Sequence, residues 1–275
     1  MLSKFNAVAV MSGASVLCLR MHSTCIASAD QADSNPSIKK KPSKEVKVEL
    51  SRIRLKADEI RERWIKDEEN WRKLPARAWP EVQPDADDVP RLQSLCDKLC
   101  SSPSSGGSPQ DMSACHDVTF HLATALLFNN LNVEKGLAMF ESLAEKGDVR
   151  GTTAAGICYV EGLGVTYDEE KGSRFIQHAA DKDFLQGIYE LGVLHYNGNA
   201  TPYVDENMQK AFRLFELAAS RQHTSGLYMT ADMLLTGEGC GKKDEARAIR
   251  LLYEAGERGH RNARATLWAL LREYE

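Results

Sequence analysis

The stretch Ala155-Gly156-x-x-Tyr159-x-x-Gly162 recurs along the C-terminal half of this 275-residue chain. Later copies read Leu191-Gly192-x-x-His195-x-x-Gly198 and Thr230-Ala231-x-x-Leu234-x-x-Gly237, and an earlier, weaker copy reads Leu122-Ala123-x-x-Leu126. Small residues inside a helix let a neighbouring helix approach closely, and the final glycine suits the left-handed end of a helix. The recurrence predicts that one helical unit is repeated along the chain.

A second motif follows each copy and predicts the partner helix. It opens with Asn or Asp, which are strong helix N-caps, and a small residue stands four positions later. The motif begins at Asn132, Asp168, Asn207 and Asp244, so successive copies are 36, 39 and 37 residues apart. We therefore expect antiparallel pairs of helices. The ends of the second helices are expected at Gly147, Asp183, Gln222 and Gly259.

Together these motifs resemble the Sel-like repeat family, a relative of the tetratricopeptide repeats, from Thr119 to Glu275. The resemblance implies an all-α fold, an α/α superhelix that forms a right-handed solenoid of antiparallel helix pairs. Residues 113–275 would hold about four repeats and a C-terminal capping helix. The resemblance also implies a non-catalytic, protein-binding role, such as assembly or quality control of membrane complexes. Some members carry a disulfide-linked cysteine pair in each repeat, and this chain lacks those pairs.

The first helix of each repeat generally lines the concave side of such solenoids, and one column of side chains on it is a candidate partner-binding surface. The column consists of Phe120, Thr153, Tyr189 and Tyr228, with Ile157, Val193 and Asp232 one turn further on. Aromatic side chains dominate binding hot spots, so the column predicts a groove for a partner protein. An equally good interpretation is that Tyr189 and Tyr228 pack between repeats.

Residues 45–74 predict a long amphipathic helix in front of the repeats. Spacings of three, four and seven place one apolar stripe on it, made of Val46, Leu50, Ile53, Ala57, Ile60, Trp64 and Trp71. The stripe either packs along or caps the solenoid, or forms a coiled coil with a partner. Residues 75–112 are expected to form a loop, a short helix from Asp88 to about Cys100, and a flexible insert at 101–110.

Residues 1–29 are typical of a mitochondrial presequence, because they are rich in Ser and Ala and contain Lys4 and Arg20 but no acid. The alternatives are a secretory signal ending at Ala27-Ser28-Ala29 and a cytosolic chain with a disordered start. Residues 30–44 are too polar to fold alone and are expected to be a linker. Without the first 29 residues the net charge falls from −4 to −6, which argues against nucleic-acid binding.

Seven cysteines are present, and Cys18 and Cys25 lie in the first 29 residues. The remaining five are odd in number, which predicts no disulfide framework and favours a reducing compartment. Cys96, Cys100, Cys115 and His116 could supply four zinc ligands, although thiols that line a helix contact are the favoured interpretation. No metalloprotease, nucleophile-elbow or EF-hand motif occurs, and no cofactor is expected.

The sequence therefore predicts a non-catalytic scaffold or adaptor that binds a partner protein, in mitochondria and more specifically in the matrix. No stretch reaches 18 consecutive apolar residues, so no transmembrane segment is expected. Two alternatives remain open at this point. The first is an endoplasmic-reticulum quality-control adaptor, if residues 1–29 are a signal peptide. The second is a hydrolase that depends on the zinc or thiols of the Cys96 cluster.

Overall fold

The computed structural model describes residues 42–71, 84–100, 109–198 and 204–273, and every regular element in these ranges is a helix. The contacts divide the chain into two compact units. Of the described residues, the first unit holds 84–198 with 204–205, and the second holds 206–273 together with 42–71. The N-terminal helices therefore belong to the same unit as the C-terminal repeats, although most of the chain separates them in sequence.

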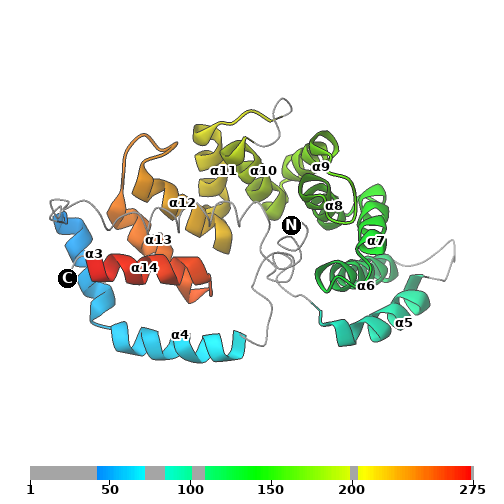
Figure 1. The fold of residues 1–275 in the computed structure, drawn as a ribbon, viewed down its shortest axis with the longest axis horizontal. Coiled ribbons are helices and arrows are strands. Elements are labelled where there is room, and N and C mark those ends of the chain that lie inside the picture. Colours follow the sequence, from blue (N-terminus) through cyan, green and yellow to red (C-terminus); the bar gives the residue numbers. More distant parts are fainter. Residues whose placement is uncertain (1–41, 72–83, 101–108, 199–203, 274–275) are drawn as a thin grey trace, which may run out of the picture. The chain divides into compact units, whose positions relative to one another are not determined.

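The first unit begins with a short 3-10 turn, η2 (Ala86–Asp88), which leads into α5 (Val89–Cys100). The helices that follow are α6 (Pro109–Phe128), α7 (Val133–Glu145), α8 (Val149–Glu161), α9 (Glu169–Asp181) and α10 (Leu185–Asn197). Each helix packs against the next one along the chain from α5 to α10 (Figure 1). Helix α6 begins four residues before the predicted solenoid start at 113, because Pro109 fits the first turn of a helix.

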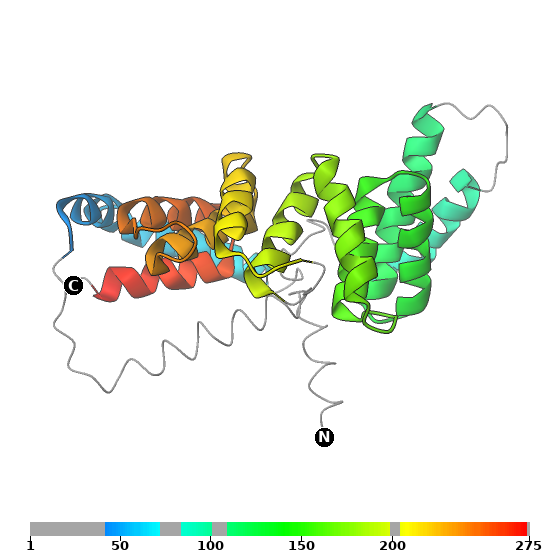
Figure 2. The same ribbon diagram turned by 90° about the horizontal axis from the view of Figure 1, so that it is seen from above.

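The second unit contains the later repeats and the N-terminal helices. Its helices are α11 (Met208–Ser220), α12 (Thr224–Thr236), α13 (Glu245–Glu257), α14 (Arg261–Glu273), α3 (Lys44–Arg54) and α4 (Ala57–Trp71). Consecutive repeat helices again pack against each other, and α3 packs against α13 (Figure 2). All eight helices from α7 to α14 are 13 residues long, as a regular repeat requires.

The predicted helix boundaries are confirmed at the capping residues. The side chains of Asn132, Asp168, Asn207 and Asp244 each accept a hydrogen bond from the backbone N–H three residues later, at 2.9–3.0 Å. Helices α8, α10 and α12 end at Gly162, Gly198 and Gly237, all of which have positive φ. Positive φ also occurs at the four predicted ends of the second helices, Gly147, Asp183, Gln222 and Gly259. The Asn and Asp residues therefore cap the second helices as predicted, and the helices end at the predicted left-handed residues.

Small residues bring α8 and α9 into close contact. A Cβ atom added to Gly156 would lie 3.1 Å from the carbonyl oxygen of Gly172. A Cβ atom added to Gly172 would lie 2.5 Å from Val160 Cγ2. The 2.5 Å distance is shorter than real Cβ contacts and the 3.1 Å distance is at the tight end of their range, so glycine is the residue that fits at both positions when the two helix backbones pack at this separation.

The tyrosine and the lysine of the repeat motifs meet on the preceding repeat. Tyr159 donates a hydrogen bond to Glu141 Oε1 at 2.5 Å, and Lys171 Nζ lies 2.9 Å from the same oxygen. Lys171 also lies over the ring of Tyr159, 4.0 Å from its centroid. Arg247 and Glu216 form the corresponding ion pair at 2.6 Å in the second unit. The motif residues therefore link α9 to α7 in the first unit and α13 to α11 in the second.

The N-terminal segment is not the single helix that the sequence predicts. It breaks at Leu55–Lys56 into α3 and α4, although the apolar stripe at Val46, Leu50, Ile53, Ile60 and Trp64 is buried as expected. Glu49 and Arg63 would be about 21 Å apart in a straight helix, whereas their partners on α13, seven residues apart, are separated by about 10 Å. The break shortens the span between Glu49 and Arg63, so that both can reach α13. Trp71 lies at the end of α4, and its side chain is outside the described part of the chain.

None of the described helices is long and apolar enough to cross a membrane.

Candidate functional site

The predicted column on the first helices of the repeats is mostly interior. Phe120, Thr153, Tyr189 and Val193 are buried, with at most 5% of each residue exposed, whereas Ile157, Tyr228 and Asp232 are half-buried. The ring of Phe120 packs against that of Phe140, with centroids 5.5 Å apart. The Thr153 hydroxyl donates a hydrogen bond to the backbone oxygen of Val149 at 2.8 Å. The four buried residues therefore belong to the core of the first unit and do not form a surface groove.

The column residues are buried because other helices surround most of the first helix of each repeat. Helix α10 buries every residue from Gln186 to Leu194, and α8 buries nine of its 13 residues. A helix that is apolar nearly all round is an interior helix. Of the seven predicted column residues, only the three half-buried ones reach solvent, one in the first unit and two in the second.

Tyr228 and Asp232 lie one turn apart on α12 and form the accessible part of the column in the second unit. The ring of Tyr228 stacks on the imidazole of His260, with centroids 4.5 Å apart. Burial and the nearby Glu238 carboxylate raise the pKa of Asp232 to about 6. No ion pair involves Asp232 within the described residues, so this carboxylate lacks a cationic neighbour to compensate its charge.

A second acidic group, Glu190 on α10, lies entirely inside the first unit. Burial raises the pKa of Glu190 to about 8, with a further contribution from the charge of Glu161. Gln186 donates a hydrogen bond to Glu190 Oε1 at 2.6 Å, which favours the charged form but does not offset burial. Glu190 is therefore protonated over much of the neutral range.

The histidines at the repeat ends act as helix caps. His223 Nδ1 accepts a hydrogen bond from the backbone N–H of Gly226 at 3.1 Å, and His260 Nδ1 accepts one from Ala263 at 3.2 Å. Burial lowers the pKa of His223 to about 4, so its ring is neutral and able to accept at physiological pH. The half-buried His195 contacts the backbone oxygen of Asp205 at 2.9 Å through Nδ1. These contacts give all three histidines a structural role in the repeats.

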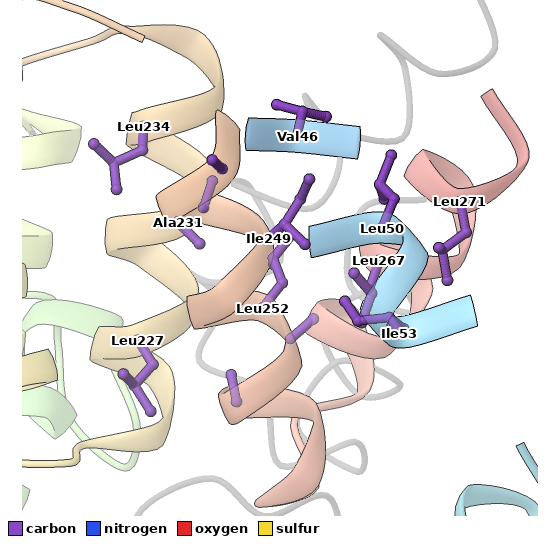
Figure 3. Close-up of a cluster of buried hydrophobic side chains, with 14 of the residues drawn as sticks. Val46, Leu50, Ile53, Leu227, Ala231, Leu234, Ile249, Leu252, Leu267 and Leu271 are labelled. Atoms are coloured by element: carbon purple, nitrogen blue, oxygen red, sulfur yellow. The ribbon is translucent and has the colours of Figure 1, made fainter. Parts of the chain in front are cut away.

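The N-terminal helices pack on the last repeat within the second unit. Val46, Leu50 and Ile53 of α3 share one hydrophobic cluster with Ile249 and Leu252 of α13 and with Leu267 and Leu271 of α14 (Figure 3). The guanidinium of Arg54 also donates to the backbone oxygen of Leu271 at 2.8 Å. Of the two hypotheses for the stripe, the structure supports packing against the repeats of the same chain.

Trp64 is the central residue of this N-terminal cap, defined as α3 with α4. Its indole Nε1 donates to Glu257 Oε1 at 2.9 Å, and the same carboxylate accepts from Arg63 at 2.7 Å. The ring of Trp64 packs edge-on against that of Trp268, with centroids 5.8 Å apart. The guanidinium of Arg264 lies 4.6 Å from the centroid of the Trp64 ring.

The indole of Trp64 occupies the space beside Gly256. A Cβ atom added to Gly256 would lie 2.8 Å from Trp64 Cη2. The corresponding positions of the two preceding repeats hold Ala180 and Ala219. Glycine replaces alanine in the one repeat against which the cap packs, so the last repeat is adapted to Trp64.

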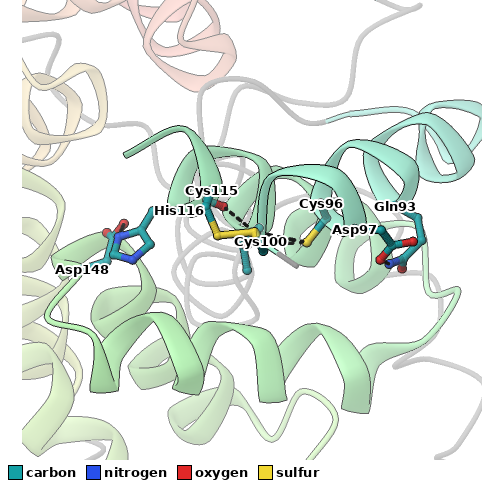
Figure 4. Close-up of a disulfide and its surroundings, with 8 residues drawn as sticks. Gln93, Cys96, Asp97, Cys100, Cys115, His116 and Asp148 are labelled. Atoms are coloured by element: carbon teal, nitrogen blue, oxygen red, sulfur yellow. Dashed lines mark hydrogen bonds and ion pairs between the residues drawn. A yellow bond between two sulfur atoms is a disulfide. The ribbon is translucent and has the colours of Figure 1, made fainter. Parts of the chain in front are cut away.

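The candidate zinc set is not assembled by the structure. Cys100 and Cys115 form a disulfide that joins α5 to α6, with their Cα atoms 5.4 Å apart (Figure 4). His116 is directed instead toward Asp148, with 3.7 Å between Nδ1 and Oδ2. Within the described ranges, no group of three or more His, Cys, Asp or Glu side chains is arranged to hold a metal ion.

The disulfide corrects the expectation of free thiols at Cys100 and Cys115. Cys96 stays a half-buried thiol, and its sulfur lies 3.8 Å from that of Cys100. The preference for a reducing compartment rested on unpaired cysteines, and this pairing removes that support. Cys158 and Cys240 are free thiols, and burial raises the pKa of Cys158 far above its usual range.

Three features were missed by the sequence interpretation, and two of them left a signal. The first signal is glycine at position 256, where the two preceding repeats have alanine and where the cap packs. The second is Glu190, a carboxylate inside an otherwise apolar run. The pairing of Cys100 with Cys115 follows from how α5 and α6 pack, and cysteine spacing alone does not determine it.

Repeated antiparallel helix pairs with capped second helices define a helical-repeat protein. The sequence matches the Sel1 repeat family over residues 152–184, 185–223 and 224–260. Residues 152–260 of this chain therefore consist of three Sel1 repeats. The helix pair of α6 and α7 precedes the matched residues but has the same cap at Asn132.

Two curated relatives come from Saccharomyces cerevisiae. The chitin synthase regulator SKT5 is 26% identical over 145 residues, which are 48% of this chain and 20% of SKT5. Protein SHC1 is 31% identical over 72 residues, which are 26% of this chain and 14% of SHC1. The matched part of this chain thus spans a fifth or less of the length of these relatives.

Solved structures of similar proteins include two bacterial ones. A Sel1 repeat protein from Oxalobacter formigenes has a TM-score of 0.41 and 23% identity, over 48% of this chain and 97% of that chain. The antigen c5321 from uropathogenic Escherichia coli, which displays a Sel1-like repeat fold, has a TM-score of 0.48 and 20% identity, over 65% of this chain and 40% of that chain.

Proposed function

We propose that this chain is a non-catalytic scaffold that binds a partner protein through the second unit, at the surface around Tyr228 and Asp232. The observation that carries the proposal is an accessible aromatic ring one helical turn from a half-buried carboxylate, which has no cationic neighbour among the residues that the structure describes. Sel1 repeats generally form interaction scaffolds, and the relative SKT5 is named as the regulator of an enzyme. By analogy, the partner is an enzyme whose activity depends on the bound scaffold.

The chemistry of the surface defines the kind of segment that it binds. Burial and the carboxylate of Glu238 both disfavour the charged form of Asp232. A Lys or Arg side chain of the partner would supply the positive charge that compensates it. Binding of a cation there favours the ionised form of Asp232, so binding also lowers its pKa. An apolar neighbour of that basic residue would cover the Tyr228 ring, as aromatic anchors do at protein interfaces.

Affinity purification with chemical crosslinking tests this proposal. The wild-type chain is compared with Asp232→Asn and Tyr228→Ala, which remove the charge and the ring, and with Tyr228→Phe, which keeps the ring on His260. Leu131→Ala is the matched control, because it removes an exposed apolar side chain from the loop after α6, away from α12. We expect recovery of the partner to fall about tenfold or more for Asp232→Asn and Tyr228→Ala only.

The proposal is contradicted if a partner binds all four variants equally well, or if none is recovered with the wild-type chain. Circular dichroism of each variant shows that the helices remain folded. A loss of binding without a loss of helix then reports on the surface itself.

We further propose a mitochondrial location, supported by the acid-free, Ser- and Ala-rich residues 1–29, which lie outside the described residues. The disulfide between Cys100 and Cys115 favours a compartment in which disulfides persist, so it supports the intermembrane space over the matrix. The same disulfide supports a second candidate, an adaptor of the endoplasmic reticulum.

Sequencing the N-terminus of the mature protein separates these two locations. A start near Ser23 indicates processing of a mitochondrial presequence, and a start at Asp30 indicates cleavage of a signal peptide after Ala29. A chain that keeps Met1 contradicts both.

A further inference from the structure

The contact between α5 and α6 brings three cysteine sulfurs together. Cys96 and Cys100 lie one helical turn apart on α5, and Cys115 lies on α6. Cys100 is bonded to Cys115, and its sulfur is also 3.8 Å from the sulfur of Cys96. Figure 4 shows the Cys100 sulfur between those of Cys96 and Cys115. A thiol therefore contacts one particular sulfur of a disulfide.

We propose that these three cysteines form a thiol–disulfide exchange site. The Cys96 thiol loses its proton to water, and the thiolate attacks the Cys100 sulfur. A bond forms between Cys96 and Cys100 while the bond between Cys100 and Cys115 breaks, and Cys115 leaves as a thiolate that takes up a proton from water. The number of disulfides is unchanged, so the step needs neither an oxidant nor a reductant.

The position of Cys100 permits the new bond. Side chains four residues apart on a helix have Cβ atoms about 5–6 Å apart, whereas a disulfide needs about 3.5–4.5 Å. Cys100 is the last residue of α5 and is exposed, so it can leave the helical conformation and close this gap without disturbing the turns before it.

The hydroxyl of Thr119 assists the exchange. Thr119 Oγ1 lies 3.7 Å from the Cys96 sulfur and 3.6 Å from the Cys100 sulfur, and the side chain is buried one turn after Cys115 on α6. A hydroxyl in this place can donate a hydrogen bond to the attacking thiolate, which stabilises the negative charge before the bond forms.

The exchange changes how α5 is attached. In the described state a covalent bond joins the end of α5 to α6, and after exchange the disulfide lies within α5 alone. The side chains of α5 are then held by noncovalent contacts, which include its packing on α6 and the hydrogen bond that Lys135 Nζ of α7 donates to Gln93 Oε1 at 2.8 Å. The site thus couples the position of one disulfide to the attachment of one helix.

Peptide mapping of the full-length protein under non-reducing conditions tests the proposal directly. Trypsin cleaves after Lys98, so Cys96 lies in peptide 92–98, whereas Cys100 and Cys115 lie together in peptide 99–135. Before exchange these peptides are separate, and after exchange the disulfide links them. The protein is incubated at mildly alkaline pH, quenched with acid and alkylated, and fragment spectra locate the linked and alkylated cysteines.

We expect the linked peptides 92–98 and 99–135 in about a tenth of the chains or more, with Cys115 alkylated. In Cys96→Ser, alkylation of Cys115 should fall about tenfold, whereas Cys240→Ser, the matched loss of another half-buried thiol, should change nothing. In Cys115→Ser, oxidised glutathione should produce the bond between Cys96 and Cys100. The proposal is overturned if no linked peptide forms in either the wild type or Cys115→Ser. Equal alkylation of Cys115 with and without Cys96 also overturns it.

Discussion

Replacing Gly256 with alanine places a methyl group against the indole of Trp64. The new Cβ would lie 2.8 Å and 2.9 Å from two carbons of the indole and 3.2 Å from Arg264 Cγ. Overpacking of this kind costs about 1–3 kcal/mol, whereas the better helix propensity of alanine contributes about 1 kcal/mol in the opposite direction. We therefore expect Gly256→Ala to destabilise the second unit by about 1 kcal/mol.

The sign of this effect depends on Trp64. In a Trp64→Ala background the overlap is absent, so the same substitution should stabilise α13 by about 0.5–1 kcal/mol through helix propensity. The coupling free energy between the two positions is then about 2 kcal/mol. Ala180→Gly is the matched control, because it exchanges the same two residues at the equivalent position of an earlier repeat, outside the cap. It should cost about 1 kcal/mol in both backgrounds.

Urea unfolding measured by circular dichroism gives these free energies, and hydrogen exchange of peptides from α13 and α14 places the change in the second unit. If Gly256→Ala stabilised the wild-type chain as much as the Trp64→Ala chain, the indole would not occupy this space. The last repeat would then not be adapted to the N-terminal cap.

Three further predictions concern groups inside the repeats. The pKa of Glu190 is raised from 4.5 to about 8, so the stability of the wild type falls as pH rises between these values. Glu190→Gln should therefore stabilise the protein near pH 8 by a few kcal/mol, on the order set by this pKa shift. The same substitution should change little near pH 4. The pKa of His223 is lowered to about 4, so the wild type loses stability as pH falls from 6.5 to 4. In acid unfolding, His223→Asn should reduce that loss, because Asn also caps the N-terminus of a helix and does not titrate. Asp168→Ala should cost about 1 kcal/mol in urea unfolding and Asp168→Asn almost nothing, because Asn caps the same helix at Asn132. Parallel pH profiles for variant and wild type, or equal costs for the two Asp168 variants, would contradict these assignments.

The repeat architecture could be predicted from the sequence because its signals are local. N-caps such as Asp168 and left-handed ends such as Gly162 are determined by the backbone chemistry of one or two turns, and their recurrence makes them specific. The same is true of Gly156 and Gly172, whose small size is required by the backbone that faces them.

The candidate surface could be predicted only in part, because burial depends on contacts that are distant in sequence. Tyr189 and Tyr228 occupy the same position of the repeat, yet Tyr189 is buried and Tyr228 is half-exposed. The stripe from Val46 to Trp64 predicted a buried face, but its partner, the last repeat, lies almost 200 residues away. The break at Leu55 and the pairing of Cys100 with Cys115 likewise depend on which helices meet.

A crosslinking experiment tests most directly the claim that α3 and α4 cap the last repeat of their own chain. Glu49 and Arg250 form an ion pair at 3.0 Å, and both are changed to cysteine and joined with a short bismaleimide. Equal amounts of 15N-labelled and unlabelled chains are mixed before the reaction, and mass spectrometry identifies the linked peptides. We expect a link between positions 49 and 250 with both peptides labelled or both unlabelled. Mixed pairs would show that the cap packs on another chain, and the absence of the link would contradict the cap altogether.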